Sequence, residues 1–268
     1  MAEARPNHPH APRSAERDFG AFMGALGGRN PALFLDYDGT LTPIVDRPER
    51  AVLDDATRDA VARLAALCPV AVVSGRDLDD VARMVGLEEL VYAGSHGFDI
   101  RGPHLRTQIG LEYIPALEQA GSVLRDRLAD VPGVLVERKR FAIAVHTRLV
   151  EPDRKPGVAE AVRAVAEGES NLRVTGGKEI LELRPNLPWD KGRAVLALLD
   201  TLGLAGAMPV YIGDDETDED AFRALDGRGM GIRVMGSPAE TAAGWSLSDP
   251  EEVRRFLKRL AAELTGQR

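Results

Sequence analysis

Short apolar runs alternate with amphipathic stretches along the first part of the chain. The apolar runs lie at 32–35, 69–73 and 90–94, and the stretches between them, 57–67 and 78–86, have helical spacing. Strand, helix and strand in this order predict βαβ units and hence a parallel sheet. Because the runs are apolar throughout rather than alternating, we expect helices on both faces of this sheet.

The same pattern returns near the end of the chain. It comprises, in order, a helix, a strand, a helix and a strand at 192–202, 208–213, 218–225 and 230–235. We interpret the two regions, 28–104 and 186–268, as halves of one doubly wound, Rossmann-like α/β core.

The pattern changes between residues 105 and 185. A long helix (113–129) is followed by two adjacent strands (134–140 and 141–148), a helix (157–167) and two more strands. This α+β sequence predicts an inserted cap domain over 105–185.

Residues 1–17 are rich in Pro, Ala, Arg and His without an apolar period, so we expect a disordered tail there.

Composition narrows the class of protein. The 268 residues carry a net charge of -8, which argues against nucleic-acid binding, because a phosphate backbone is held by clustered Lys and Arg. No apolar run reaches the length of about 18 residues that spans a bilayer, and no apolar leader follows the N-terminus. We therefore expect a cytoplasmic protein with no membrane partner, and a monomer. The single cysteine, Cys68, forms no internal disulfide.

Two aspartates directly follow the apolar run at 32–35. Asp36 and Asp38 lie two residues apart, so in extended backbone both project the same way beyond the strand's carboxyl end. Doubly wound sheets bind ligands at that edge, and carboxylates this close are stable only around a cation or a shared proton. Gly39 permits an unusual backbone conformation, and Thr40 and Thr42 offer hydroxyls to a phosphate. We predict a divalent metal site; a turn capped by two acids is the alternative.

A second acidic run, 213–220, begins at the end of another apolar strand and precedes a helix. Asp214, the first residue after the strand, is best placed to supply a third metal carboxylate, with Asp215 and Asp218 as nearby supporting groups. The competing interpretation is an acidic helix N-terminus, which the helix dipole favours.

A calcium loop is the other metal site that alternating acids suggest. An EF-hand loop requires Glu at its twelfth position. The twelfth residue is Arg47 when counted from Asp36 and Leu225 when counted from Asp214, so both runs fail this test.

Two further positions predict an anion site. Ser74, Gly75 and Arg76 follow the apolar run at 69–73 and precede a helix, which places a hydroxyl and free backbone N–H groups where an anion would bind. Lys191 begins a helix, where its charge opposes the dipole, in a chain that has 29 Arg and only 5 Lys. A plain strand-to-helix turn and an exposed first-turn lysine are the alternatives.

Four segments, taken in chain order, resemble the four motifs of the haloacid dehalogenase superfamily of phosphatases: 36–43, 72–76, Lys191 and 213–220. The resemblance implies that Asp36 is the nucleophile and Asp38 the general acid and then base. It implies that Ser74 and Lys191 bind the phosphate. It further implies a Mg²⁺ ion held by Asp36, Asp38 (through its backbone carbonyl) and Asp214, and a cap of the kind found in sugar phosphatases.

The strands expected in the cap carry a polar face. Glu137 and Lys139 share one face of the first strand, and Glu182 and Lys178 are in phase on the last. Acids, bases and small residues together suit the hydroxyls of a neutral sugar; a merely solvated sheet face is the alternative.

Three segments are similar to the trehalose-6-phosphate phosphatases: 93–100, 137–148 and 176–186. The resemblance covers most of residues 31–245. It implies that the substrate, a small sugar phosphate, is bound by cap residues Glu137, Lys139, Arg148, Lys178 and Glu182. On the core side it implies His96, Gly97 and Arg47, beside Gly75 and Arg76 of the anion site.

Three alternative functions share parts of this pattern. A phosphatase of another sugar phosphate, such as sucrose phosphate or mannosyl-phosphoglycerate, would have a similar cap, although a second negative group would call for more basic residues than Glu137 and Glu182 allow. A phospho-accepting receiver domain is small, has no insert and lacks an acid at the position of Asp38. A non-catalytic sugar-phosphate binder is the third, and nothing expected of a catalyst is missing.

Overall fold

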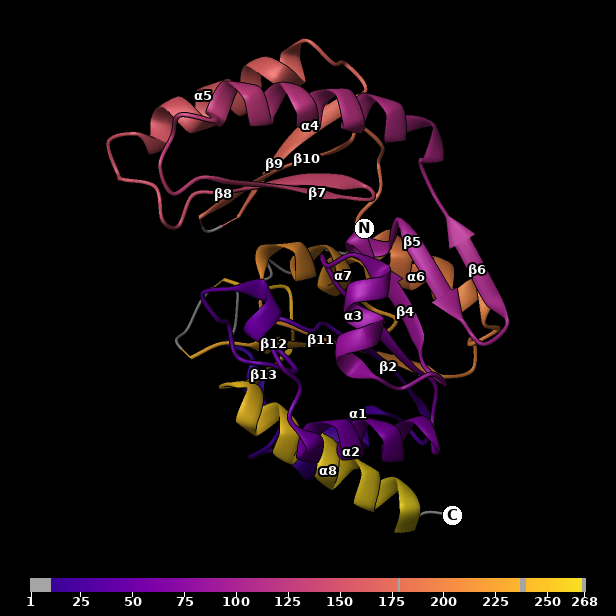
Figure 1. Cartoon of the computed structure of the whole chain (residues 1–268). Helices are drawn as coiled ribbons and strands as arrows, with labels where there is room; N and C mark the ends of the chain where they lie inside the picture. The colour runs from indigo at the N-terminus through magenta and orange to yellow at the C-terminus, as the bar shows by residue number, and fades with distance from the viewer. Residues whose placement is uncertain (1–10, 178, 237–239, 267–268) are drawn as a thin grey trace, which may run out of the picture.

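The computed structural model describes residues 11–177, 179–236 and 240–266. It contains a nine-stranded and a four-stranded sheet. Figure 1 shows them as separate layers, with the four-stranded sheet above the larger one and its helices on the far side. The predicted α/β class with a doubly wound core is confirmed.

The larger sheet has the strand order β1-β13-β12-β11-β2-β3-β4-β5-β6. Its strands from β1 to β4 in this order are parallel, and β5 and β6 are antiparallel additions at one edge. The nine strands are β1 (Arg13–Ser14), β2 (Pro31–Leu35), β3 (Val70–Val73), β4 (Val91–Gly94), β5 (Asp99–Gly102), β6 (Leu105–Gln108), β11 (Met208–Gly213), β12 (Met230–Val234) and β13 (Trp245–Leu247). The chain winds away from β2 in one direction first and returns to pair β11 on its other side. The β2–β11 boundary is therefore the switch point at which such sheets bind ligands.

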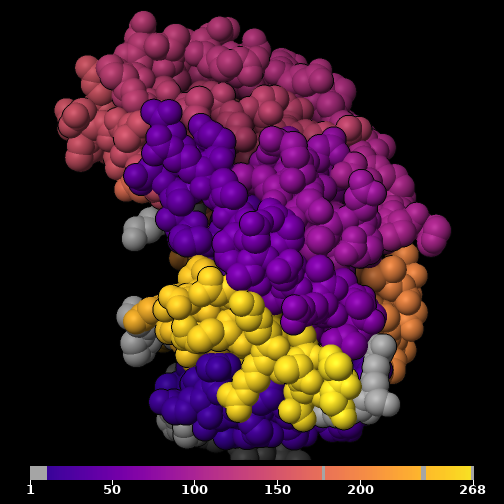
Figure 2. All heavy atoms as spheres, turned by 60° about the horizontal axis from the view of Figure 1, so that its bottom comes forward, coloured from indigo at the N-terminus to yellow at the C-terminus, as the bar shows by residue number. Residues whose placement is uncertain are grey.

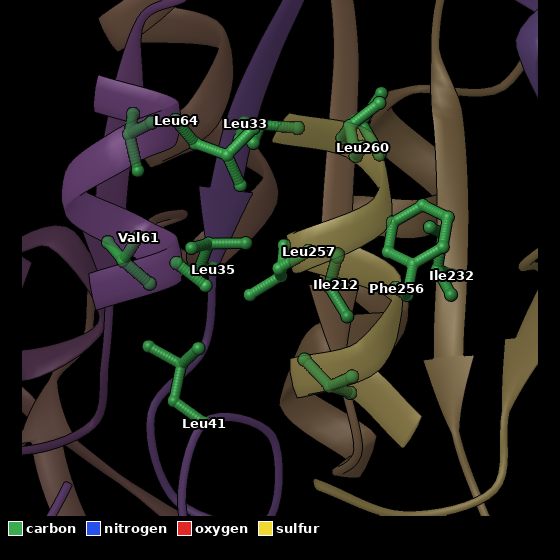
Figure 3. Packing of buried hydrophobic residues seen from close by; sticks show 14 of the residues in the cluster. Leu33, Leu35, Leu41, Val61, Leu64, Ile212, Ile232, Phe256, Leu257 and Leu260 are labelled. Carbon is green, nitrogen blue, oxygen red and sulfur yellow. The ribbon is translucent and has the colours of Figure 1, made fainter. Parts of the chain in front are cut away.

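Helices cover both faces of this sheet, as its apolar strands predict. One face packs against α1 (Phe19–Ala25), α2 (Asp55–Ala65), α3 (Leu78–Val85) and α8 (Pro250–Gly266), and the other against α6 (Lys191–Thr201) and α7 (Glu219–Ala224). Neighbouring residues of β2 alternate between the two: Leu33 and Leu35 join the first cluster, and Phe34 joins the second. Figure 3 shows Leu35 beside Val61 of α2, with Leu257 of α8 close by. Helix α8 lies along the outside of this face (Figure 2).

The smaller sheet is antiparallel, in the order β7-β8-β10-β9. Its elements are α4 (Ile114–Leu128), β7 (Leu135–Lys139), β8 (Ala142–His146), α5 (Lys155–Glu167), β9 (Leu172–Gly177) and β10 (Ile180–Pro185). One face packs on α4 and α5 through a cluster that includes Ile143, Val145 and Leu183. The opposite face is directed at the larger sheet (Figure 1).

Two expected boundaries differ from the structure. Strand β6 pairs with β5 in the larger sheet, so the core continues past residue 104, where the sequence predicts the insert to begin. Strand β1 pairs with β13, so the part of the expected disordered tail from Arg13 onward is ordered by backbone hydrogen bonds between strands, which apolar periodicity does not reveal.

Four short 3₁₀ helices complete the described chain: η1 (Pro48–Arg50), η2 (Ser95–Gly97), η3 (Leu111–Tyr113) and η4 (Glu216–Asp218). Within the described ranges, no helix combines the length and apolarity needed to cross a membrane.

Candidate active site

Three predicted site residues follow neighbouring strands at the switch point. Asp36 follows β2, Ser74 follows β3 and Asp214 follows β11. The strands are aligned in register, with Leu35 opposite both Ile212 and Val72. Because parallel strands end at the same edge of a sheet, their last residues bring the three side chains into one region.

Lys191 joins two carboxylates at this edge. Its Nζ donates to Asp36 Oδ1 at 2.9 Å and to Asp218 Oδ1 at 2.6 Å, and its side chain is only 3% exposed. Asp190 caps α6 by accepting from the backbone N–H of Arg193, which fixes the first turn from which Lys191 extends. Burial lowers the pKa of Lys191, but the two carboxylates outweigh it and raise that pKa above the ordinary value. The lysine is therefore a permanent buried cation.

Asp214 lies against the backbone of the first motif. Gly39 has φ +78°, and a Cβ at this position would lie 2.1 Å from Asp214 Oδ2, so the turn admits the carboxylate only because residue 39 is glycine. Thr40 Oγ1 also donates to Asp214 Oδ1 at 3.4 Å.

The charges of Asp36 and Asp214 are incompletely compensated by protein groups. Burial raises the pKa of Asp36 well above its ordinary value against the opposing effect of Lys191, and the nearby Asp218 and Asp214 raise it further. Burial and the neighbouring Asp218 raise the pKa of Asp214 to about 7. Oxygens of Asp36, Asp214 and Asp218 lie within 4.8 Å of one another. A hard divalent cation bound by oxygens relieves this repulsion, so the donor set fits Mg²⁺.

Asp218 supports this cluster rather than offering free oxygens to a metal. Its carboxylate accepts from Lys191 Nζ, from Tyr211 OH at 2.7 Å, and from the backbone N–H groups of Asp214 and Asp215 at 2.9 Å. These four bonds use its lone pairs. Asp215 is exposed and caps η4, and its backbone carbonyl accepts from Arg233. Both residues thus lie beside Asp214 and hold its loop.

Asp38 is held by Arg76. The guanidinium donates to both carboxylate oxygens, at 2.7 and 2.6 Å, and also to Asp80 and to the backbone carbonyl of Pro48. Arg76 is 9% exposed, whereas the side chain of Asp38 is 42% exposed. The sequence predicts Arg76 among the substrate ligands; in the structure its partners are protein oxygens.

The turn after β3 connects the two layers. Ser74 is buried, and its Oγ accepts from the backbone N–H of Arg76 at 3.1 Å. The carbonyl of Gly75 accepts from Lys139 Nζ at 3.2 Å, and Asp77 accepts from the backbone N–H of Arg140. The β7–β8 hairpin of the smaller sheet therefore lies directly on the Ser74 turn.

The polar face of the smaller sheet is arranged in cross-strand rows. One row contains Glu137, Ala144 and Glu182, and the next contains Lys139 and Ala142. Lys139 Nζ donates to Glu182 Oε1 at 2.8 Å, and both residues are largely buried. This cation keeps the pKa of Glu182 well below its ordinary value although burial opposes it. The predicted grouping of these side chains on one face is present.

Two polar residues of this face have no assigned role in the sequence prediction. His146 Nε2 lies 2.8 Å from Glu137 Oε2, and this hydrogen bond lowers the pKa of Glu137. Arg184, 8% exposed, donates to Glu182 and to His96. Side chains alternate along a strand, so the sequence alone could have predicted that Arg184 lies on the same face as Glu182. The pairing of His146 with Glu137 depends on hairpin register, which the sequence does not fix.

His96 and Gly97 form the tight turn after β4. His96 is buried with φ +58°, and its ring lies over Gly75, where a Cβ would be 2.7 Å from His96 Cε1. Gly97 has φ +90°, and a Cβ there would lie 2.2 Å from Ala194 Cβ. Gly97 thus permits the turn to pack on α6, which carries Lys191.

Three predicted ligands lie apart from this cluster or outside the description. Arg47 is exposed at the start of η1. Arg148 is exposed and donates to Val45 O and to Asp46, each at 3.3 Å, so it bridges a loop of the smaller layer to a loop of the core. Lys178 lies outside the described residues.

The fold is shared with the haloacid dehalogenase-like hydrolases. A solved haloacid dehalogenase-like hydrolase from Bacteroides thetaiotaomicron superposes with a TM-score of 0.62 at 15% identity, over 87% of this chain and all of that one, which shows the shared fold. The family model described as trehalose-phosphatase matches residues 34–251. The chain belongs to the trehalose-phosphatase family.

Individual relatives agree with this assignment. A maize protein named trehalose 6-phosphate phosphatase RA3 is 44% identical, over 92% of this chain and 74% of its own length. A solved structure titled as a trehalose-6-phosphate phosphatase related protein gives a TM-score of 0.79 at 26% identity, over 88% of this chain and all of that one.

Proposed function

We propose that this chain hydrolyses trehalose 6-phosphate to trehalose and inorganic phosphate, with Mg²⁺ as its cofactor. The observation that carries the proposal is the buried Asp36–Lys191 pair at the switch point, directly below a sheet face that presents Glu137, Lys139 and Glu182. The family supports the choice of sugar. A single anion site under a face with paired acids suits one phosphate attached to a neutral, hydroxyl-rich sugar.

Asp36, Asp214 and the backbone carbonyl of Asp38 are the groups we assign to Mg²⁺. When bound, the ion would neutralise charge on the phosphoryl oxygens and hold the phosphate against the nucleophile. The raised pKa values of Asp36 and Asp214 support this assignment, since both carboxylates lack sufficient positive charge nearby. Asp215 and Asp218 would keep the loop of Asp214 in place.

The first step is attack by a carboxylate oxygen of Asp36 on phosphorus. The bond from phosphorus to the sugar oxygen breaks, and an aspartyl-phosphate forms. Lys191 offsets the repulsion between the carboxylate and the dianionic ester, and Ser74 donates a hydrogen bond to a phosphoryl oxygen. The backbone N–H of Gly75 would contribute to the same anion site.

Asp38 is the proposed proton carrier. It would protonate the sugar oxygen as that oxygen leaves, and then accept a proton from the water that attacks phosphorus and releases Asp36. Both oxygens of Asp38 are bonded to Arg76 in the structure. Asp38 would therefore give up at least one of these bonds before it faces the leaving group, so we propose that Arg76 also controls the position of Asp38.

The sugar would bind between the two layers. Glu137 and Glu182 would accept from its hydroxyls and Lys139 would donate to them, while Ala142 and Ala144 leave space between the charged side chains. We also assign sugar contacts to Lys178, Arg148, Arg47 and the His96–Gly97 turn, in keeping with the family resemblance.

Phosphate release from a panel of sugar phosphates, with and without Mg²⁺, tests the proposal. We expect rapid release from trehalose 6-phosphate, slow release from sucrose 6-phosphate, mannosyl-phosphoglycerate and glucose 6-phosphate, and none after EDTA treatment. Preference for another ester would refute the substrate but leave the chemistry intact. Undiminished activity in EDTA would refute the metal assignment.

A further inference from the structure

Arg184 occupies an unusual place between the two layers. It lies on β10, two residues after Glu182 on the same face, and is 8% exposed. Its Nε donates to Glu182 Oε2 at 2.9 Å, and its terminal NH2 group contacts both Glu182 and the Nε2 atom of His96. One guanidinium thus joins the sugar-facing sheet to the turn beside Ser74.

The contact with Arg184 defines the protonation of His96. A guanidinium has donors only and does not lose its proton in proteins, so the contact with Arg184 uses the lone pair of His96 Nε2, whereas the more distant Glu182 Oε2, at 3.4 Å, would accept a proton there. A proton on Nε2 would point at the N–H of Arg184. Burial and the charge of Arg184 lower the pKa of His96 to about 3, so the ring is neutral. The single ring proton of a neutral imidazole that accepts at Nε2 lies on Nδ1.

This assignment leaves one donor unused. Nδ1 of His96 is buried and has no hydrogen-bond partner among the residues that the structure describes. A buried donor without a partner is rare and destabilising. Ser95 and His96 also have positive φ values, of 49° and 58°, a strained conformation that is concentrated at functional sites.

The surroundings of His96 indicate which ligand would use the donor. The backbone N–H of His96 donates to Ser74 O at 2.8 Å, and the ring covers Gly75. Lys191 is close enough to lower the pKa of His96, and Glu182 Oε2 lies 3.4 Å from Nε2. His96 is therefore situated between the anion site and the proposed sugar face.

We propose that Arg184 is a positioning residue that holds His96 as the neutral Nδ1–H tautomer, so that Nδ1–H donates a hydrogen bond to a sugar oxygen of the bound sugar phosphate. The same guanidinium orients Glu182. The proposal rests on the function proposed above for its substrate, but the tautomer itself is a property of the free protein.

The tautomer can be measured by ¹⁵N NMR of protein labelled at its histidines. The chain has five histidines, and the signal of His96 is the one that disappears in His96→Asn. We expect the Nδ1–H form in the wild type. In Arg184→Met, Glu182 is the remaining partner near Nε2 and should draw the proton there. Arg184→Lys keeps a donor-only cation and should retain the Nδ1–H form. Arg173→Met is the matched control, because Arg173 also lies on the smaller sheet but donates to Trp189 O.

An Nε2–H or doubly protonated ring in the wild type would overturn the proposal even if Arg184→Met failed to fold. An unchanged tautomer in a folded Arg184→Met would overturn the positioning role.

Kinetics tests the donor itself. Arg184→Met should lower kcat/KM for trehalose 6-phosphate by about tenfold, the effect of losing one or two hydrogen bonds. Turnover of p-nitrophenyl phosphate, which has no sugar, should fall much less, and Arg184→Lys should recover part of the loss. Equal losses on both esters would contradict donation to the sugar phosphate and indicate a general structural role. If the wild type hydrolyses no trehalose 6-phosphate at all, the proposed function and the donation fail together, while the NMR result still decides the role of Arg184.

Discussion

Replacement of Lys191 by methionine is the perturbation whose effect the structure predicts most fully. The change keeps most of the side-chain volume but removes the charge that pairs with Asp36 and Asp218 at 2.9 and 2.6 Å. The side chains of these three residues are 3%, 6% and 0% exposed, so water cannot replace the lost ammonium without entering the core. Two buried carboxylates would be left without a counter-charge.

The expected cost is large. Removing one partner of a buried ion pair destabilises a protein by about 3–5 kcal/mol. For a protein of this size, about 2–4 °C is lost per kcal/mol, so Tm should fall by roughly 6–20 °C. Urea unfolding in EDTA, which prevents a metal ion from compensating the charge, measures the loss directly. Lys258→Met is the matched control, because Lys258 is exposed on α8 and its removal should change stability little.

The loss should depend on pH in a defined direction. Lys191 has a raised pKa, so its contribution is complete at any pH below about 10 and declines only as pH rises further. Asp36 already has a raised pKa, and without Lys191 its protonated form is favoured further. Protonation at pH 5 should therefore restore part of the stability that the variant lacks at pH 8. A loss below about 1 kcal/mol at pH 8, or a larger loss at pH 5, would refute the reasoning.

Three further predictions concern the metal, the first turn and the sugar face. Mg²⁺ at about 100 times its Kd should stabilise the wild type by about 2.7 kcal/mol in thermal unfolding, and no shift would exclude binding to Asp36 and Asp214. Gly39→Ala should abolish most Mg²⁺-dependent activity, because its Cβ would displace the carboxylate of Asp214, whereas Gly203→Ala, with φ +64° and open space, should retain it; equal effects would attribute the loss to backbone strain alone. Glu182→Gln should reduce kcat/KM for trehalose 6-phosphate far more than for p-nitrophenyl phosphate, and equal reductions would remove Glu182 from sugar recognition.

The core and its site are predictable from the sequence because they depend on which residues directly follow each strand. Each acidic or hydroxyl motif directly follows an apolar strand, and parallel strands end at one edge, so Asp36, Ser74 and Asp214 converge without knowledge of side-chain packing. The doubly wound class follows from the same alternation.

The remaining features depend on long-range contacts that no local pattern encodes. Arg76 follows Ser74 as an anion ligand would, yet its guanidinium reaches back to Asp38, 38 positions earlier in the chain. Arg184 lies 88 positions from His96 in the chain, and β1 pairs with β13, which lies more than 230 residues away. Strand alternation selects the face on which Arg184 lies, but its partner is set by how the two layers meet.

Phosphate release from trehalose 6-phosphate by the wild type and by Asp36→Asn, measured side by side with saturating Mg²⁺, tests the central claim most directly. The substitution keeps the shape of the side chain but removes the proposed nucleophile, so we expect a folded protein with no detectable turnover. A folded Asp36→Asn protein that still releases phosphate at a rate comparable to that of the wild type would contradict the account.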